Sequence, residues 1–221
     1  MKAALRHIVA HTYKPLLVKY LSKTRIYKYG DIRLEIPPQV FHPGFFFSTQ
    51  VLLQYIGKLP LPAKRFLELG AGSGLISIYA AKKGASVMAT DINPVAVEYL
   101  RRNSEQNNVK MEIILSDLFA DIPEQSFDII AINPPYYKKH PQTIADHAWY
   151  CGENGEYFQK LFNKLGEYMD KNSTVLMVLS EEGDIDMISQ IASDHNFYIH
   201  KKITEKSLWE YLYIYQIACI R

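Results

Sequence analysis

Three acidic side chains accompany successive apolar segments, at the spacing expected where strands end on one edge of a sheet. Glu68 lies in FLEL, Asp91 directly follows SVMAT, and Asp117 follows MEIIL after one serine. Carboxylates accept hydrogen bonds from amino and hydroxyl groups. Because ligands of open α/β sheets bind at the carboxyl ends of the strands, we expect the three acids to share one site.

A glycine-rich segment, Gly70-Ala71-Gly72-Ser73-Gly74, follows Glu68. Glycine lets the backbone turn tightly and approach a ligand without a Cβ in the way. A GxGxxG pyrophosphate fingerprint would need glycine where the chain has Leu75, so the segment does not match it. Glu68 suits a ligand with a positive amino or sulfonium group better than one with phosphates. The alternative is a plain glycine-rich turn without a ligand.

Asp91 and Asp117 could bind the rest of such a ligand. Asp91 stands 21 residues after Gly70, where the acid of dinucleotide-binding folds accepts both hydroxyls of a ribose. It could instead cap the helix that begins near Pro94, although Asn93 could fill that position and leave Asp91 for the ligand. Asp117 could accept a hydrogen bond from an adenine amino group.

The segment Asn133-Pro134-Pro135-Tyr136 ends a fourth apolar run, FDIIAI. Residues before proline avoid the helical region, so the carbonyls of Asn133 and Pro134 should be held in fixed directions and can both accept from one NH2 group. Two acceptors stabilise the positive charge that develops when a delocalised, poorly nucleophilic NH2 is methylated. Tyr136 can pack its ring against a planar target group. The alternative is a rigid turn after a core strand.

Apolar runs alternate with helical periodicity from Arg65 onward, which predicts a doubly wound α/β fold with a mostly parallel sheet. The runs are RFLEL, SVMAT, MEIIL, FDIIAI and STVLMVL, and helical periodicity occurs around residues 74–83, 94–106, 155–170 and 184–195. FYIHKKI and LWEYLYIYQIAC then follow each other across a turn near Thr204 to Ser207. They predict an antiparallel hairpin that closes the sheet edge.

The residues before this pattern predict a small cap, so we divide the chain into residues 1–60 and a domain over residues 61–221. In the cap, RIYKY and IRLEI flank Gly30-Asp31 and predict a hairpin. We interpret FHPGFFFSTQ as an aromatic loop, in which Phe45 to Phe47 are simply buried by packing, form a packed lid or line the wall of a pocket.

The composition is globular, with 48% hydrophobic and 22% charged residues and a net charge of +2. The first thirty residues are basic and contain no acid, either as one face of an amphipathic helix or as an arm that contacts phosphate. No apolar segment resembles a secretory signal or a membrane span, which favours a cytoplasmic protein. Cys151 and Cys219 lie far apart, outside any zinc spacing, so we expect no metal site.

The chain resembles the class I S-adenosylmethionine-dependent methyltransferases that methylate amino groups. Four motifs carry this resemblance, in the order ELGAGSG, Asp91, SDLF and NPPY. The resemblance covers about Phe45 to Cys219. It implies that Glu68 and the glycine segment hold the methionine end of the cofactor, Asp91 the ribose, and Asp117 with Leu118 the adenine. It also implies a seven-stranded sheet ordered 3-2-1-4-5-7-6 with the last strand reversed.

Within this group the chain is most similar to the protein-glutamine N5-methyltransferases of the release-factor type. AWYCGENGEYFQKLF has Gly152 and Gly155 where that family has glycines, although Cys151 replaces another one and HPGFFFSTQ replaces an acidic, proline-rich segment. The resemblance implies a protein substrate with an exposed glutamine loop. The alternatives are an exocyclic amine of a nucleic-acid base, flipped against Tyr136 and the Phe45 to Phe47 cluster, and a non-catalytic protein that binds the cofactor.

Overall fold

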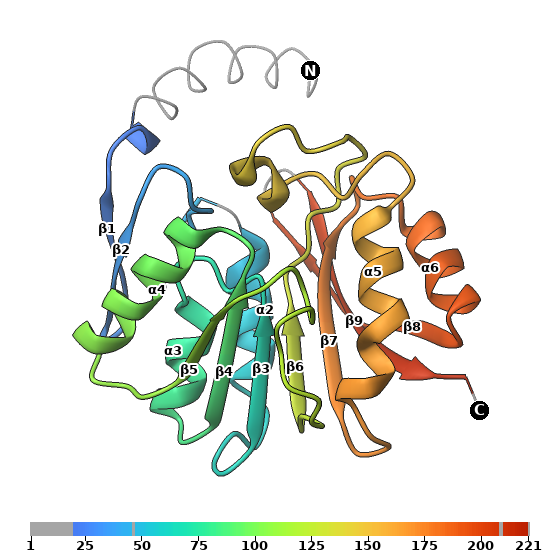
Figure 1. The fold of residues 1–221 in the computed structure, drawn as a ribbon, viewed down its shortest axis with the longest axis horizontal. Coiled ribbons are helices and arrows are strands. Elements are labelled where there is room, and N and C mark those ends of the chain that lie inside the picture. The colour runs from blue at the N-terminus through green and yellow to red at the C-terminus, as the bar shows by residue number, and fades with distance from the viewer. Residues whose placement is uncertain (1–19, 46, 208–209, 221) are drawn as a thin grey trace.

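The computed structural model describes residues 20–45, 47–207 and 210–220, so the predicted basic helix lies almost entirely outside the described residues. A seven-stranded sheet forms the centre of the molecule (Figure 1). Its strands are β3 (Arg65–Leu69), β4 (Ser86–Asp91), β5 (Glu112–Leu115), β6 (Ile129–Ile132), β7 (Thr174–Ser180), β8 (Phe197–Lys206) and β9 (Tyr211–Cys219). Their order is β5-β4-β3-β6-β7-β9-β8, and β9 runs antiparallel to both neighbours. The predicted fold and strand order are confirmed.

Helices cover both faces of the sheet. One core contains α2 (Phe47–Ile56), α3 (Leu75–Lys82) and α4 (Pro94–Gln106), and the other contains α5 (Glu156–Leu165) and α6 (Ile185–Asp194). Short 3₁₀ helices, η1 (Ile144–Ala148) and η2 (Gly166–Tyr168), flank α5. In β6, Ile129 and Ala131 belong to the first core, while Ile130 and Ile132 belong to the second. Burial on both faces explains why β6 is continuously apolar.

The predicted N-terminal hairpin is present as β1 (Arg25–Tyr29) and β2 (Ile32–Ile36). Asn103 of α4 and its C-cap residue Asn107 fasten β2 to the rest of the structure. Asn103 accepts a hydrogen bond from the Glu35 N–H at 2.8 Å and donates to the carbonyls of Glu35 and Ser73 at 3.0 and 2.9 Å. Asn107 bonds the N–H and carbonyl of Arg33 in the same way. The hairpin is therefore tied to the glycine segment through Asn103.

The interpretation of residues 41–50 as a loop is wrong in its second half, because α2 begins at Phe47. The first turn of α2 has no acidic residue, and aromatic and β-branched residues are modest helix formers. Burial of Val51, Leu52 and Ile56 stabilises this helix instead. Tertiary packing outweighs local propensity here.

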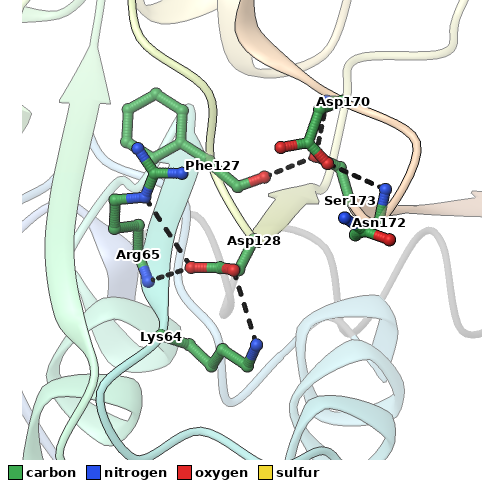
Figure 2. A network of polar contacts seen from close by, with 7 residues as sticks. All are labelled: Lys64, Arg65, Phe127, Asp128, Asp170, Asn172 and Ser173. Carbon is green, nitrogen blue, oxygen red and sulfur yellow. Dashed lines mark hydrogen bonds and ion pairs between the residues drawn. The ribbon is translucent and has the colours of Figure 1, made fainter.

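At the amino ends of the strands, Asp128 joins β3 to β6 (Figure 2). Its Oδ2 accepts the backbone N–H of Arg65 at 2.8 Å, and its Oδ1 lies 3.4 Å from Nζ of Lys64. Ser173 donates a hydrogen bond of 2.6 Å to the carbonyl of Phe127, beside the start of β7. This network lies at the end of the sheet opposite the glycine segment.

Within residues 20–45, 47–207 and 210–220, no helix is both long and apolar enough to cross a membrane. The same residues contain no group of three or more His, Cys, Asp or Glu side chains that could hold a metal ion.

Candidate cofactor and acceptor site

A pocket that is partly open to solvent lies at the carboxyl ends of β3, β4 and β6. Ten of the eleven predicted site residues line it: Glu68, Gly70, Ala71, Gly72, Asp91, Asp117, Leu118, Asn133, Pro134 and Tyr136. Segments separated by more than sixty residues in sequence therefore meet in one cavity. The eleventh residue, Gly74, does not line the pocket.

Gly74 has a packing role that the spacing of the glycines did not reveal. Its φ is +88°, and a Cβ at this position would lie 2.2 Å from Cδ1 of Leu100. A side chain would therefore overlap α4 as well as strain the backbone. Gly70, with φ +71°, has no atom within 4 Å of a Cβ position and borders open space in the pocket.

Glu68 is buried, and its carboxylate caps α3. Oε2 of Glu68 accepts hydrogen bonds from the backbone N–H of Ser77, at 2.8 Å, and from the Ser77 hydroxyl. Burial raises the pKa of Glu68 to about 8, and the charge of Asp91 acts in the same direction. A cation placed beside Glu68 would favour the ionised form. A buried carboxyl of this kind fits the positive amino or sulfonium group of S-adenosylmethionine.

Asp91 holds the glycine segment and the start of α4 at once. Its Oδ2 accepts the N–H of Gly72 and its Oδ1 accepts the N–H of Asn93, both at 2.8 Å. Burial raises the pKa of Asp91. Asn93 is the N-cap of α4 and accepts from the N–H of Val95 at 2.9 Å, so the cap is not Asp91. A carboxylate has about four acceptor positions, so Asp91 can still accept from a ribose hydroxyl beside the backbone N–H groups that it already accepts.

Asp117 lies at the pocket edge, where its Oδ2 is 2.6 Å from Nζ of Lys160 on α5. Both side chains are substantially exposed, at 41% and 63%, so this ion pair is weak and can give way to another hydrogen-bond donor. Leu118 has a φ of +54°. The hydroxyl of Ser116 holds this turn by donating to the carbonyl of Leu118 at 2.9 Å.

Asn133 follows β6 directly and contacts α2. Its Nδ2 donates a hydrogen bond of 3.2 Å to Oγ1 of Thr49, which also lines the pocket. With the amide nitrogen engaged in this way, the side-chain oxygen of Asn133 is the group left to accept from a ligand. Tyr136 lies three residues further on, with its ring centroid 4.9 Å from that of Tyr137.

Several lining residues were not predicted, among them Thr49 of α2 and the aromatic pair Phe41 and Trp149, whose ring centroids lie 5.1 Å apart. Of the alternatives for Phe45 to Phe47, neither buried packing nor the pocket wall is supported for Phe45 and Phe47, which are each 37% exposed and do not line the pocket. Phe46 lies outside the described residues. The aromatic residues of FHPGFFFSTQ predicted the right segment, since Phe41 lines the pocket, but they did not predict which residues of it do so.

Residues 33–186 match the family model of the methyltransferase small domain. The chain belongs to this family. It is a methyltransferase that uses S-adenosylmethionine, and its sheet has the arrangement of the class I enzymes.

The chain is 34% identical, over 155 residues, to a Methanocaldococcus jannaschii protein named as a putative protein N5-glutamine methyltransferase, covering 67% of this chain and 76% of that protein. Two solved structures share the fold with TM-scores of 0.62. One is the E. cuniculi Mtq2-Trm112 complex responsible for the methylation of the eRF1 translation termination factor, at 21% identity over 81% of this chain and 98% of that one. The other is the T. thermophilus 16S rRNA N2 G1207 methyltransferase with AdoMet and guanosine, at 19% identity over 88% and 50%. The chain also matches longer ribosomal protein L11 methyltransferases, of which it covers 32% to 48%.

Proposed function

We propose that the protein transfers a methyl group from S-adenosylmethionine to a planar NH2 group, and that this group is the side-chain amide of a glutamine in a protein. The observation that carries the proposal is the placement of Asn133, Pro134 and Tyr136 in the same pocket as Glu68 and Asp91. Such a transfer requires a binding site for the methyl donor and, in the same cavity, two hydrogen-bond acceptors for the NH2 group.

In this proposal the donor site is built on β3, β4 and the turn after β5. Glu68 and the segment Gly70 to Gly72 hold the methionine end, Asp91 accepts from the ribose hydroxyls, and Asp117 with Leu118 contacts the adenine. Gly74 is left out of the contacts because its space is filled by Leu100.

The acceptor site uses the oxygen of Asn133 and the carbonyl of Pro134 to receive both N–H groups of the amide. The nitrogen lone pair attacks the methyl carbon, the carbon–sulfur bond breaks, and its electron pair stays on sulfur. The nitrogen then loses one proton to solvent. Two acceptors aligned with the NH2 stabilise the charge that builds on nitrogen, and fixed alignment lowers the entropic part of the barrier.

The protein acceptor is favoured by the Methanocaldococcus jannaschii relative, which exceeds 30% identity over most of its own length. The second candidate is the exocyclic amine of a base. It is favoured by Phe41 and Trp149, which could stack a planar base at the pocket wall.

Methyl labelling separates the two candidates. The purified protein and tritiated S-adenosylmethionine are added to an extract from cells that lack the gene, and the products are digested with protease or with nuclease. We expect label to be released by protease alone and to be recovered as N5-methylglutamine. Release by nuclease alone would establish the base as acceptor instead.

A further inference from the structure

Thr49 of α2 contacts the side chain of Asn133, although it belongs to none of the sequence motifs of the site. Its Oγ1 accepts a hydrogen bond of 3.2 Å from Nδ2 of Asn133. Both residues line the pocket, and Thr49 is only 8% exposed. Among the residues that the structure describes, Thr49 is the one hydrogen-bond partner of the Asn133 side chain. The contact therefore joins the first turn of α2 to the end of β6.

The side-chain amide of Asn133 needs such a partner, because its backbone is restricted and its side chain is not. Asn133 follows β6 and precedes Pro134, which restricts its backbone to extended conformations. The last torsion of an asparagine side chain, however, has a broad and roughly two-fold energy profile. Without a contact, the amide plane would rotate and its oxygen and NH2 group would exchange places. A methyl acceptor with an NH2 group needs the oxygen to face it.

The hydroxyl of Thr49 can supply this contact because α2 is held firmly in the fold. Val51, Leu52 and Ile56 are each at most 1% exposed, and α2 packs against β7 and β9. A β-branched side chain in a helix has few rotamers, so Oγ1 of Thr49 is nearly fixed relative to the helix. The amide of Asn133 is thus oriented by a residue 84 positions away in the sequence.

The acceptor then selects one of the two orientations of the Asn133 amide. A hydroxyl both donates and accepts, so Thr49 can bond either end of the amide. The NH2 group of the acceptor, in contrast, brings only hydrogen-bond donors to the pocket. Nδ2 of Asn133 therefore stays on Thr49, where it is in the structure, and Oδ1 is left for the acceptor.

We propose that Thr49 is a positioning residue, whose hydroxyl fixes the plane of the Asn133 side-chain amide and keeps its oxygen directed at the NH2 group of the acceptor. Thr49 acts through Asn133 and needs no contact with the acceptor itself. This inference rests on the proposed function, because that function makes the Asn133 oxygen a hydrogen-bond acceptor for the NH2 group.

Three variants of Thr49 test this role with the methyl acceptor found by labelling. Thr49→Val has a similar shape and no hydroxyl, Thr49→Ala also lacks the hydroxyl, and Thr49→Ser keeps it. We expect kcat to fall about tenfold in the first two variants and to stay within about threefold of the wild type in Thr49→Ser, with the Kd for S-adenosylmethionine unchanged throughout. Thr174→Val is the matched control, because Thr174 begins β7 and does not line the pocket. It should keep the wild-type kcat.

Two further measurements separate positioning from a structural effect. In the double variant Asn133→Ala/Thr49→Val, the transfer rate should stay within about twofold of that in Asn133→Ala, because two residues that act as a unit are not lost independently. The side-chain NH2 signal of Asn133, identified by its loss in Asn133→Ala, should exchange its protons with water faster in Thr49→Val than in the wild type or in Thr49→Ser. This NMR signal needs no methyl acceptor. Thr49→Ala and Thr49→Ser still give both comparisons if Thr49→Val does not fold.

Wild-type kcat in Thr49→Val and Thr49→Ala, together with loss of transfer in Asn133→Ala, would overturn the positioning role and leave the proposed function standing. Equal losses of kcat in Thr49→Val and Thr49→Ser would also overturn it, because the hydroxyl would then not matter. Weaker cofactor binding at an unchanged kcat would assign Thr49 to the donor site and contradict the inference. Wild-type transfer in Asn133→Ala would contradict the proposed function itself.

Discussion

The backbone N–H of Gly72 donates a hydrogen bond of 2.8 Å to Oδ2 of Asp91, which fastens the glycine segment after β3 to the carboxyl end of β4. Asp91 thus shapes the pocket as well as lining it. A change at Asp91 should loosen the segment beneath the cofactor and remove the proposed ribose contact together.

We therefore predict that Asp91→Ala weakens the binding of S-adenosylmethionine about 10- to 100-fold, the loss expected for charged hydrogen bonds. Calorimetry measures the Kd. Asp128→Ala is the matched control, because Asp128 makes a similar backbone contact at the far end of the sheet. It should lower stability by about 1 kcal/mol and leave the Kd unchanged. An unaltered Kd in Asp91→Ala would exclude the ribose contact.

Gly74→Ala should destabilise the protein by about 2–3 kcal/mol, because the new methyl group overlaps Leu100 and the backbone has a φ of +88°. Denaturant unfolding measures the change. Gly166→Ala is the control, since Gly166 has a φ of −62° and its Cβ would meet Phe197 at an ordinary 3.7 Å. That variant should stay within about 0.5 kcal/mol of the wild type. Equal stability of the two variants would refute the packing role of Gly74.

The stability of the cofactor-free protein should fall as the pH rises from about 4.5 to 8. The pKa of Glu68 is raised from 4.5 to about 8, so the folded state binds its proton more tightly than the unfolded state does. The stability that Glu68 contributes is fully present below its pKa in the unfolded state. It is lost as the pH rises through its pKa in the folded state, and it amounts to at most about 5 kcal/mol. Glu68→Gln should flatten the profile. Identical pH profiles for the two proteins would contradict the raised pKa.

Cofactor binding at pH 7 should release a proton, because a positive group beside Glu68 favours its ionised form. Because the buffer takes up the released proton, the heat of binding measured by calorimetry should depend on the ionisation enthalpy of the buffer. Glu68→Gln should abolish that dependence. Its persistence in the variant would assign the proton to another group.

Asn103→Ala should destabilise the protein by about 2–4 kcal/mol, because it leaves the buried carbonyl of Ser73 and the partly buried backbone groups of Glu35 without this partner. Gln106→Ala, on the exposed side of the same helix, should change stability by less than about 0.5 kcal/mol. Unfolding monitored by circular dichroism compares the two. A small effect of Asn103→Ala would show that the hairpin does not depend on this residue.

The mostly parallel sheet and its closing hairpin could be predicted from sequence because apolar runs alternate with helical repeats until the hairpin breaks that alternation, whereas the strand order followed from the resemblance to the class I methyltransferases. The N-cap role open to Asn93 was also readable, since caps depend on neighbouring residues. Helix α2 was missed because it is stabilised by burial and lacks local start signals. Other features could not be predicted because they depend on chain segments that meet only in the fold. These are the contact of Thr49 with Asn133, the pair of Phe41 and Trp149, and the contact of Ser180 with Glu210.

The most direct test of the account is single-turnover methyl transfer by Asn133→Ala, with cofactor saturating. We expect binding of S-adenosylmethionine to remain unchanged and the transfer rate to fall about 100-fold or more, as when a contact made in the transition state is removed. Transfer at the wild-type rate would contradict the role of Asn133 as an acceptor of the NH2 group, and with it the proposed chemistry of the site.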